Sequence, residues 1–183
     1  MKINFITGNP QKVAIAQAGL APFEIIQTDV DLPEIQTMSL RDIAVFSAKQ
    51  ALHILNRPLM LTDSGFFIEG LNGFPGPFVK WTNQTLTNHD FLAMLLNKGN
   101  RRAHTEDCVV YVEPGQEPVV FYSKISGKIV TDAPQNKSSI SQLFIPDALG
   151  HPVSHLSFEQ EALFWAQHNT NYSQLKSYLL SKK

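Results

Sequence analysis

Residues 61–81 are Leu61-Thr-Asp-Ser-Gly-Phe-Phe-Ile-Glu-Gly-Leu-Asn-Gly-Phe-Pro-Gly-Pro-Phe-Val-Lys-Trp81. The first residues predict an apolar strand that brings Asp63 into a glycine turn. The remainder predicts a Gly/Pro-rich loop that ends in Lys80 and Trp81. Glycine lets a backbone approach a ligand closely, proline restricts the path of the chain, and such loops present binding residues on a rigid scaffold. The stretch therefore predicts a ligand site that uses the carboxylate of Asp63.

Outward from this stretch, apolar runs that predict strands alternate with segments of helical periodicity. Asn9 and Pro10 favour a helix start, as the N-cap and the first helical residue. We expect strands over 3–6, 23–30, 58–62 and 66–69, helices over 10–21, 39–55, 88–96, 158–168 and 170–180, a hairpin of 105–112 with 118–130, and loops over 131–150. This order predicts one mixed α/β domain over residues 1–183, with a partly antiparallel sheet.

The charge composition argues against a protein that binds nucleic acid by electrostatics. Fifteen basic and sixteen acidic residues give a net charge of −1, whereas such proteins carry a basic excess. The basic residues between Lys98 and Arg102 are too few for a basic stripe, and we expect a solvated loop there. A single nucleotide stays open as a ligand.

The apolar and cysteine contents predict a cytoplasmic protein. Cys108 is the one cysteine of the chain, so no internal disulfide forms and a reducing compartment is expected. Its alternating surroundings predict a small core residue of a strand rather than a nucleophile. No run approaches the roughly 18 apolar residues of a membrane span, and the N-terminal residues do not resemble a signal peptide.

A phosphate site is predicted where the first strand meets the first helix. Thr7-Gly8-Asn9 places free backbone N–H groups and the positive end of the helix dipole toward a possible anion. Lys12 would add a positive charge, and Thr7 and Asn9 would donate hydrogen bonds. Alternatively, Asn9 is only a helix cap and Lys12 only a solvated side chain. The motif is neither a Walker A loop nor a dinucleotide fingerprint.

A metal site is predicted from two carboxylates. Magnesium bound to a triphosphate needs only one or two protein carboxylates, because phosphate oxygens and water complete its coordination. Asp63 is one candidate, and Glu34, after the second strand, is the other. A metal there would polarise the phosphate and help to generate hydroxide. Alternatively, Glu34 is a solvated loop acid and Asp63 a turn residue that bonds its own backbone.

Read in order, these segments resemble the inosine triphosphate pyrophosphatase family, which hydrolyses non-standard purine nucleoside triphosphates. The resemblance is collinear over residues 3–130 and rests on several short motifs. In chain order they are Thr7–Lys12 for Thr-Gly-Asn-x-x-Lys, Asp31–Glu34 for Asp-Leu-Pro-Glu, Thr62–Gly65 for acidic-Asp-Ser-Gly, Leu71–Gly76 for Leu-x-Gly-x-Pro-Gly, Pro77–Trp81 for the eukaryotic branch, and Ser126–Ile129 for the Gly-x-Ile of the hairpin.

The resemblance implies an elongated mixed α/β sheet flanked by helices, with a central cleft between two lobes, and a homodimer. It implies a magnesium-dependent enzyme that cleaves the triphosphate to monophosphate and pyrophosphate. Catalytic roles would fall to Asp63, Lys12 and Glu34, with Glu34 and Asp63 as metal ligands. Substrate binding would fall to Thr7, Gly8, Asn9, Lys12, Ser64, Gly65, Lys80 and Trp81.

The chain departs from the family pattern in three places. Thr62 stands where the family has an acid, and it cannot supply the same charge. The segment ahead of Phe144, residues 138–142, lacks the family's aromatic platform, and base stacking on an aromatic ring contributes about 1–3 kcal/mol. The Lys and the Ser-His-Arg that read the purine are missing near residues 161–171, where Gln167 or His168 would be a partial substitute.

Three functions stay open from the sequence. The first is a nucleoside triphosphate pyrophosphatase of this family with altered base preference. The second is hydrolysis of another phosphoanhydride, with Trp165, Trp81 or Phe144 forming a different pocket. The third is nucleotide or partner binding without turnover, with Thr62 as the sign of lost catalysis.

Overall fold

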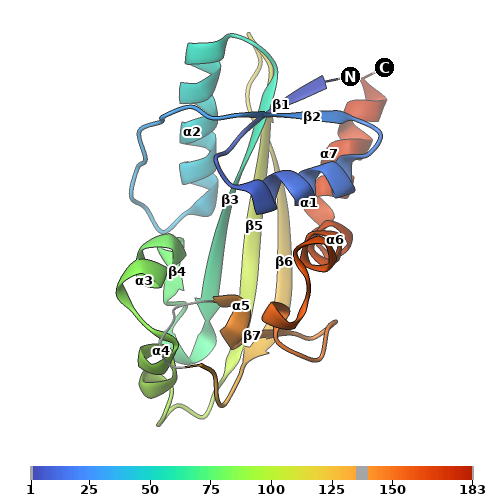
Figure 1. The fold of residues 1–183 in the computed structure, drawn as a ribbon. Helices are drawn as coiled ribbons and strands as arrows, with labels where there is room; N and C mark the ends of the chain where they lie inside the picture. The colour runs from blue at the N-terminus through green and yellow to red at the C-terminus, as the bar shows by residue number, and fades with distance from the viewer. Residues whose placement is uncertain (1, 135–139, 183) are drawn as a thin grey trace. The chain divides into compact units, whose positions relative to one another are not determined.

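The computed structural model of the chain describes residues 2–134 and 140–182 (Figure 1). The strands are β1 (Lys2–Ile6), β2 (Glu24–Thr28), β3 (Leu59–Ile68), β4 (Pro75–Gly76), β5 (Arg102–Val112), β6 (Val119–Ile129) and β7 (Phe144–Pro146). The α-helices are α1 (Pro10–Leu20), α2 (Leu40–Leu55), α3 (Val79–Thr85), α4 (Asn88–Met94), α5 (Ile140–Leu143), α6 (Phe158–His168) and α7 (Thr170–Ser181). Two 3₁₀ helices, η1 (Glu69–Leu71) and η2 (Val153–His155), complete the described elements.

The strands form a mixed sheet in the order β2-β1-β3-β5-β6-β7, with β4 paired to β3. β1 is parallel to both β2 and β3, whereas β4 is antiparallel to β3 and β7 is antiparallel to β6. This confirms the predicted mixed α/β class. The parallel part explains the near-continuous apolar runs of β1 and β3, because a parallel strand is covered on both faces.

The chain divides into two compact units. The first contains Met1–Asp63, Asp107–Ser123 and Phe158–Lys183, and the second contains Ser64–Glu106 and Lys124–Ser157. β3, β5 and β6 contribute residues to both.

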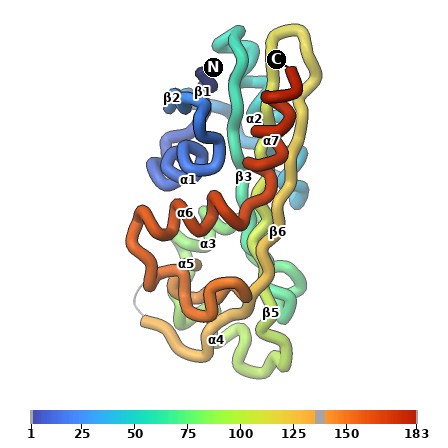
Figure 2. The backbone as a smooth tube through the Cα atoms, turned by 90° about the vertical axis from the view of Figure 1, so that its right-hand side faces the viewer, coloured from blue at the N-terminus to red at the C-terminus, as the bar shows by residue number. Residues whose placement is uncertain are grey.

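In the first unit, the N-terminal helix packs with the two C-terminal helices. Contacts of α1 with α6 and α7 bring together segments about 150 residues apart in the chain, as Figure 2 shows. Their shared core joins residues of β1, β2, β3 and β5, including Phe5, Met60 and Val109. The helix α2 lies across the strands from α7 (Figures 1 and 2). Ser39 caps α2 by accepting a hydrogen bond from the backbone N–H of Asp42 at 3.2 Å.

The predicted turn at Asp63 is wrong, because β3 continues from Leu59 to Ile68. A Cβ atom at Gly65 would lie 2.7 Å from the ring of Phe67 and 3.1 Å from the carbonyl oxygen of Gly76. Gly65 therefore serves the close approach of Phe67 and β4 rather than a change of direction. Asp63 accordingly projects from a regular strand.

The prediction that the Gly/Pro-rich loop extends to Lys80 and Trp81 is also wrong, because both residues belong to α3. This helix has seven residues, and Gly76 and Pro77 ahead of it favour a loop. In the described part of residues 131–150, the expected loops contain α5 and β7. The predicted hairpin and the two predicted C-terminal helices are confirmed.

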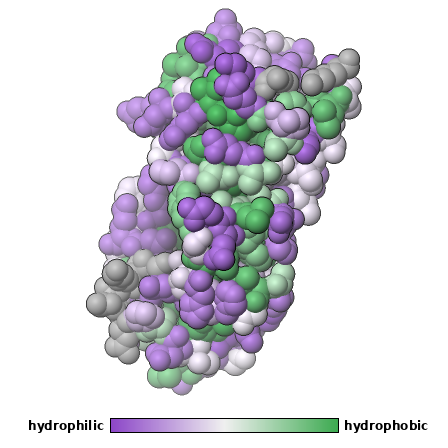
Figure 3. All heavy atoms as spheres, turned by 45° about the vertical axis from the view of Figure 1, so that its right-hand side comes forward, coloured by the Kyte–Doolittle hydropathy of each residue, from purple (hydrophilic) through white to green (hydrophobic). Residues whose placement is uncertain are grey.

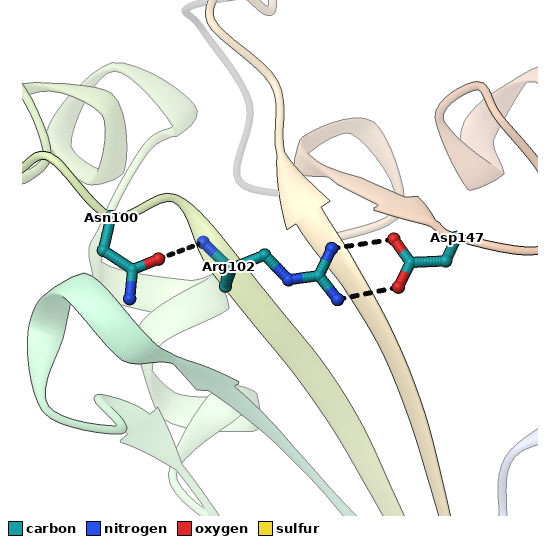
Figure 4. Close-up of polar contacts among 3 residues, drawn as sticks. All are labelled: Asn100, Arg102 and Asp147. Atoms are coloured by element: carbon teal, nitrogen blue, oxygen red, sulfur yellow. Dashed lines mark hydrogen bonds and ion pairs between the residues drawn. The ribbon is translucent and has the colours of Figure 1, made fainter.

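An ion pair in the second unit connects the start of β5 to the segment after β7 (Figure 4). The guanidinium of Arg102 donates to both carboxylate oxygens of Asp147 at 2.8 and 2.7 Å, and the backbone N–H of Arg102 donates to Oδ1 of Asn100 at 2.8 Å. These hydrogen bonds lower the pKa of Asp147 and raise that of Arg102. The expected solvated loop at 98–102 is therefore partly wrong, since Arg102 is engaged in a bidentate pair.

On the face drawn in Figure 3, small hydrophobic groups are separated by hydrophilic residues. Large hydrophobic side chains that are exposed come from several elements and include Met38, Trp81, Leu96 and Phe158. No helix in the described ranges has the length and apolar character needed to cross a membrane.

Candidate active site

The parallel strands bring three sequence motifs to one edge of the first unit. Ile6, at the end of β1, pairs with Thr28 at the end of β2 and with Leu61 in β3. The segments that follow Ile6 and Thr28 leave the sheet at this level and contain the Thr7–Asn9 turn and the loop that carries Glu34. β3 continues beyond Leu61, so Thr62 and Asp63 lie beside these segments within the strand. The carboxyl edge of parallel strands is the usual ligand site of α/β folds.

The turn into α1 is built as the sequence predicts. Oδ1 of Asn9 accepts a hydrogen bond from the backbone N–H of Gln11 at 2.9 Å, and Pro10 is the first helical residue. Oγ1 of Thr7 accepts from the backbone N–H of Asn9 at 3.1 Å. The capping role of Asn9 is confirmed. Gly8 and Asn9 are exposed, so a ligand in solvent can reach this helix start.

Lys12 extends to the strand that carries Asp63. Its Nζ donates to the backbone carbonyl oxygen of Thr62 at 3.0 Å, in partly buried surroundings. The alternative of a freely solvated Lys12 is therefore wrong. The contact brings the ammonium of the first motif to the residue that precedes the candidate carboxylate.

The two candidate metal ligands differ in their surroundings. Asp63 is half-buried within β3, and Glu34 is exposed in the loop between β2 and α2. Among the described residues, no group of three or more His, Cys, Asp or Glu side chains is arranged to hold a metal ion.

One acid at this edge was missed by the sequence reasoning. A Cβ atom at Gly8 would lie 3.5 Å from Oδ1 of Asp29, so the Asp29 carboxylate borders the predicted phosphate turn. Its position directly after β2, equivalent to that of Thr7 after β1, is the signal that could have identified it. A carboxylate beside a phosphate turn disfavours a bare anion and favours one accompanied by a cation.

Four predicted substrate-binding residues belong to the second unit. Ser64 and Gly65 lie inside β3, and Lys80 and Trp81 are exposed on α3. Their roles stay predictions.

Cys108 is a buried strand residue, as predicted. Burial raises the pKa of its thiol to about 12, although a hydrogen bond with Tyr122 opposes the shift, and the charges of Asp107 and Asp63 add to it. The thiol is therefore protonated near neutral pH and is a poor nucleophile.

Of the residues named for an alternative base pocket, Phe144 and Trp165 make contacts within the fold, whereas Trp81 is exposed on α3. Phe144 is buried and meets Phe66 edge to face, and Trp165 donates to Oε1 of Glu161 at 3.0 Å. His168 stacks on Phe164, and its Nδ1 lies 2.8 Å from the carbonyl oxygen of that residue. Oε1 of Gln142 accepts a hydrogen bond from the side-chain amide of Asn88 at 2.7 Å. Residues 138–139, also in the segment predicted to lack an aromatic platform, lie outside the described residues.

The place where the family has an acid is closed from solvent. Thr62 is 9% exposed, and its side chain faces the hydroxyl of the buried Tyr172 on α7. Beside them, Nδ2 of Asn171 donates to the carbonyl oxygen of Asp107 at 3.0 Å and to its Oδ2 at 2.7 Å. Among the described residues, Oγ1 of Thr62 and Oδ1 of Asn171 are buried without a hydrogen-bond partner.

Residues 3–164 match the Ham1 family, and the chain belongs to this family. It is 36% identical over 165 residues to a dITP/XTP pyrophosphatase of Methanopyrus kandleri, covering 88% of this chain and 87% of that protein. It is 41% identical over 130 residues to a dITP/XTP pyrophosphatase of Methanosarcina acetivorans, covering 70% and 71%. The Ham1 protein of Staphylococcus aureus has the same fold, with a TM-score of 0.78, 22% identity and full coverage of both chains.

Proposed function

We propose that this protein hydrolyses nucleoside triphosphates with non-standard purines, such as ITP and XTP, to the monophosphate and pyrophosphate. One observation carries the proposal: the ammonium of Lys12 lies 3.0 Å from the carbonyl oxygen of the residue before Asp63. The cation that we propose to bind phosphate thus lies beside the strand of the proposed carboxylate. The relatives named dITP/XTP pyrophosphatase support the reaction and the substrate class.

The phosphate chain would be bound at the start of α1. The helix dipole at this turn favours negative charge. The backbone N–H groups of Asn9 and Gln11 already donate to side chains of the turn, so the dipole and Lys12 would be the main attraction. Lys12 would add a charge-assisted hydrogen bond, which is about twice as strong as a neutral one. Thr7, Gly8 and Asn9 hold the turn in this form.

Asp63 and Glu34 would hold magnesium, with substrate oxygens and water as its other ligands. When bound, it supplies charge neutralisation on the phosphates and a water of lowered pKa. Asp63 would orient the attacking water and accept its proton while the bond between the α- and β-phosphates breaks. Asp29 would add negative charge beside the turn.

The Lys and the Ser-His-Arg by which the family reads the purine are missing near residues 161–171. We therefore infer a relaxed preference among purines. Ser64, Gly65, Lys80 and Trp81 are proposed as further substrate contacts, which single substitutions to alanine and a change in KM would test.

The function is tested by measuring pyrophosphate release from ITP, XTP, dUTP and the four standard triphosphates, with and without Mg²⁺. We expect magnesium-dependent hydrolysis with kcat/KM for ITP and XTP about tenfold above that for ATP and GTP, because one or two hydrogen bonds to the base give discrimination of this order. Equal rates for all purines would contradict the substrate class. Nucleotide binding without turnover would contradict the enzymatic proposal.

The proposal includes a homodimer in the cytoplasm. Light scattering during size-exclusion chromatography tests the dimer, and cell fractionation tests the location. A monomeric mass at the concentration of the activity assay would contradict the first.

A further inference from the structure

The Gly/Pro-rich loop before α3 packs against the half-buried ring of Phe67 on β3. A Cβ atom at Gly76 would lie 3.4 Å from Cε1 of this ring, and one at Gly73 would lie 3.7 Å from its Cδ1. Both glycines have positive φ angles, 61° and 87°, which glycine adopts most readily. The loop therefore turns directly beside the ring of Phe67.

The same ring stacks on the imidazole of His104 in β5. The two ring centroids lie 5.1 Å apart, and their planes differ by 7°. Nε2 of His104 lies 3.3 Å from Oε1 of Glu106, and the side chain of His104 is only 14% exposed, so the imidazole is itself held in place. An aromatic pair adds to stability beyond the area that it buries. The ring of Phe67 thus links β5 to the loop.

The loop is joined to α3 by consecutive backbone hydrogen bonds. Phe67 pairs with Pro75 of β4. The backbone N–H of Phe78 donates to the carbonyl oxygen of Pro75 at 3.2 Å, and that of Trp81 donates to the carbonyl oxygen of Phe78 at 3.0 Å. A displacement of the loop would therefore be transmitted to the first turn of α3, which carries Lys80 and Trp81.

We propose that Phe67 is a positioning residue for α3: its ring, stacked on His104, fixes the loop that determines where Lys80 and Trp81 lie. These residues all belong to the second unit. The inference rests on the proposed function for the role of Lys80 and Trp81 in substrate binding. It assigns no contact between Phe67 and the substrate.

The first test is the steady-state hydrolysis of ITP by Phe67→Leu, which keeps an apolar side chain and removes the ring. We expect KM to rise about three- to tenfold, the range that the contribution of an aromatic pair allows, because α3 would be in its binding position for less of the time. The kcat should change by less than about twofold, since the groups proposed for the chemistry belong to the first unit.

Phe121→Leu is the matched control for this test. Phe121 is also a half-buried strand residue beside an aromatic ring, with its centroid 5.7 Å from that of Tyr178, but it belongs to the first unit. Its substitution should lower stability and leave KM unchanged. An unchanged KM in Phe67→Leu, or an equal rise in Phe121→Leu, would overturn the inference.

Two substitutions of His104 separate ring stacking from the contact with Glu106. His104→Ala removes both and should raise KM as Phe67→Leu does. His104→Phe restores a flat ring without the ion pair and should keep KM within about twofold of the wild type. Equal rises of KM in the two variants would overturn the role of the stack.

The position of α3 can also be measured without substrate, from the fluorescence of Trp81. The chain has two tryptophans, so Trp165→Phe leaves Trp81, which is 52% exposed, as the single reporter. In this background we expect acrylamide to quench Trp81 more strongly in Phe67→Leu and equally well in Phe121→Leu. Unchanged quenching in Phe67→Leu would overturn the inference.

The two readouts distinguish this inference from the proposed function. If the wild type does not hydrolyse ITP, the proposed function fails, and the quenching of Trp81 alone decides whether Phe67 positions α3. If Phe67→Leu is unfolded in a thermal melt, His104→Ala replaces it in both measurements, because it removes the same stack from the other side.

Discussion

Two polar regions of the first unit differ in their access to solvent. At the carboxyl edge of β1, β2 and β3, Gly8 and Asn9 are exposed and Lys12 is half-buried. At the start of α7, Asn171 is fully buried and Tyr172 nearly so, and their partners lie inside the protein. The first region can meet a ligand, whereas the second stabilises the fold. The comparison teaches that the polar turn at the start of α1 is open to a ligand, while the polar side chains at the start of α7 are used for packing.

The largest effect on activity should come from Asp63→Asn. The amide cannot hold a cation or accept a proton as the carboxylate does, so we expect ITP hydrolysis to fall at least about 100-fold. Steady-state pyrophosphate release measures this. Asp42→Asn, at the exposed start of α2, is the control and should stay near the wild-type rate. If Asp63→Asn keeps more than a tenth of the wild-type activity, the proposed catalytic role of the Asp63 carboxylate is contradicted.

Lys12→Met should have the next largest effect. Loss of a charged hydrogen bond to phosphate lowers kcat/KM for ITP by about 10- to 100-fold, on the order of 1.5–3 kcal/mol. Lys2→Met is the matched control, because Lys2 is exposed and forms a 3.3 Å ion pair with Glu24 at the opposite end of β1. Equal kcat/KM values for the two variants would show that the start of α1 does not bind phosphate.

Asn171→Ala should change stability rather than base preference. Removing the amide leaves the buried oxygens of Asp107 without this donor, so the free energy of unfolding should fall by about 1–3 kcal/mol. Urea unfolding measures this, with the exposed Gln174→Ala as control. The ratio of ITP to ATP hydrolysis should equal that of the wild type. A changed ratio would mean that α7 reads the base after all.

Cys108→Ala should have the smallest effect. The raised pKa of about 12 keeps the thiol protonated at pH 8, which excludes it as a nucleophile. ITP hydrolysis should stay within about twofold of wild type, and iodoacetamide should label native Cys108 far more slowly than the urea-unfolded chain, because the thiolate is the reactive form. Rapid labelling of the native protein, followed by loss of activity, would contradict this account.

The turn into α1 could be predicted from sequence because its signals are local. Asn9, Pro10 and the glycine between strand and helix each favour one backbone geometry, and the structure has that geometry. The same holds for Ser39 at the start of α2. Capping residues and helical periodicity act over a few residues, so they do not depend on the rest of the fold.

The wrong or missed predictions concern residues whose roles depend on contacts formed only in the folded structure. Gly65 indicates a turn in sequence, but its role is to admit Phe67 and Gly76, which come from the same strand and from β4. Likewise, Thr62 is buried near Tyr172, 110 positions further along the chain, which no local pattern reveals. Asp29 was missed because only the pairing of β2 with β1 brings its carboxylate beside Gly8.

The central claim is that Asp63 and Lys12 serve one polyphosphate and its cation. Calorimetric titration of pyrophosphate with and without Mg²⁺, in the wild type and in Asp63→Asn, tests it most directly. We expect Mg²⁺ to tighten pyrophosphate binding in the wild type at least about tenfold, as attraction between a carboxylate and a divalent cation near a protein surface allows. In Asp63→Asn this enhancement should be lost, while metal-free binding through Lys12 should remain. An enhancement of the same size in Asp63→Asn would contradict the account.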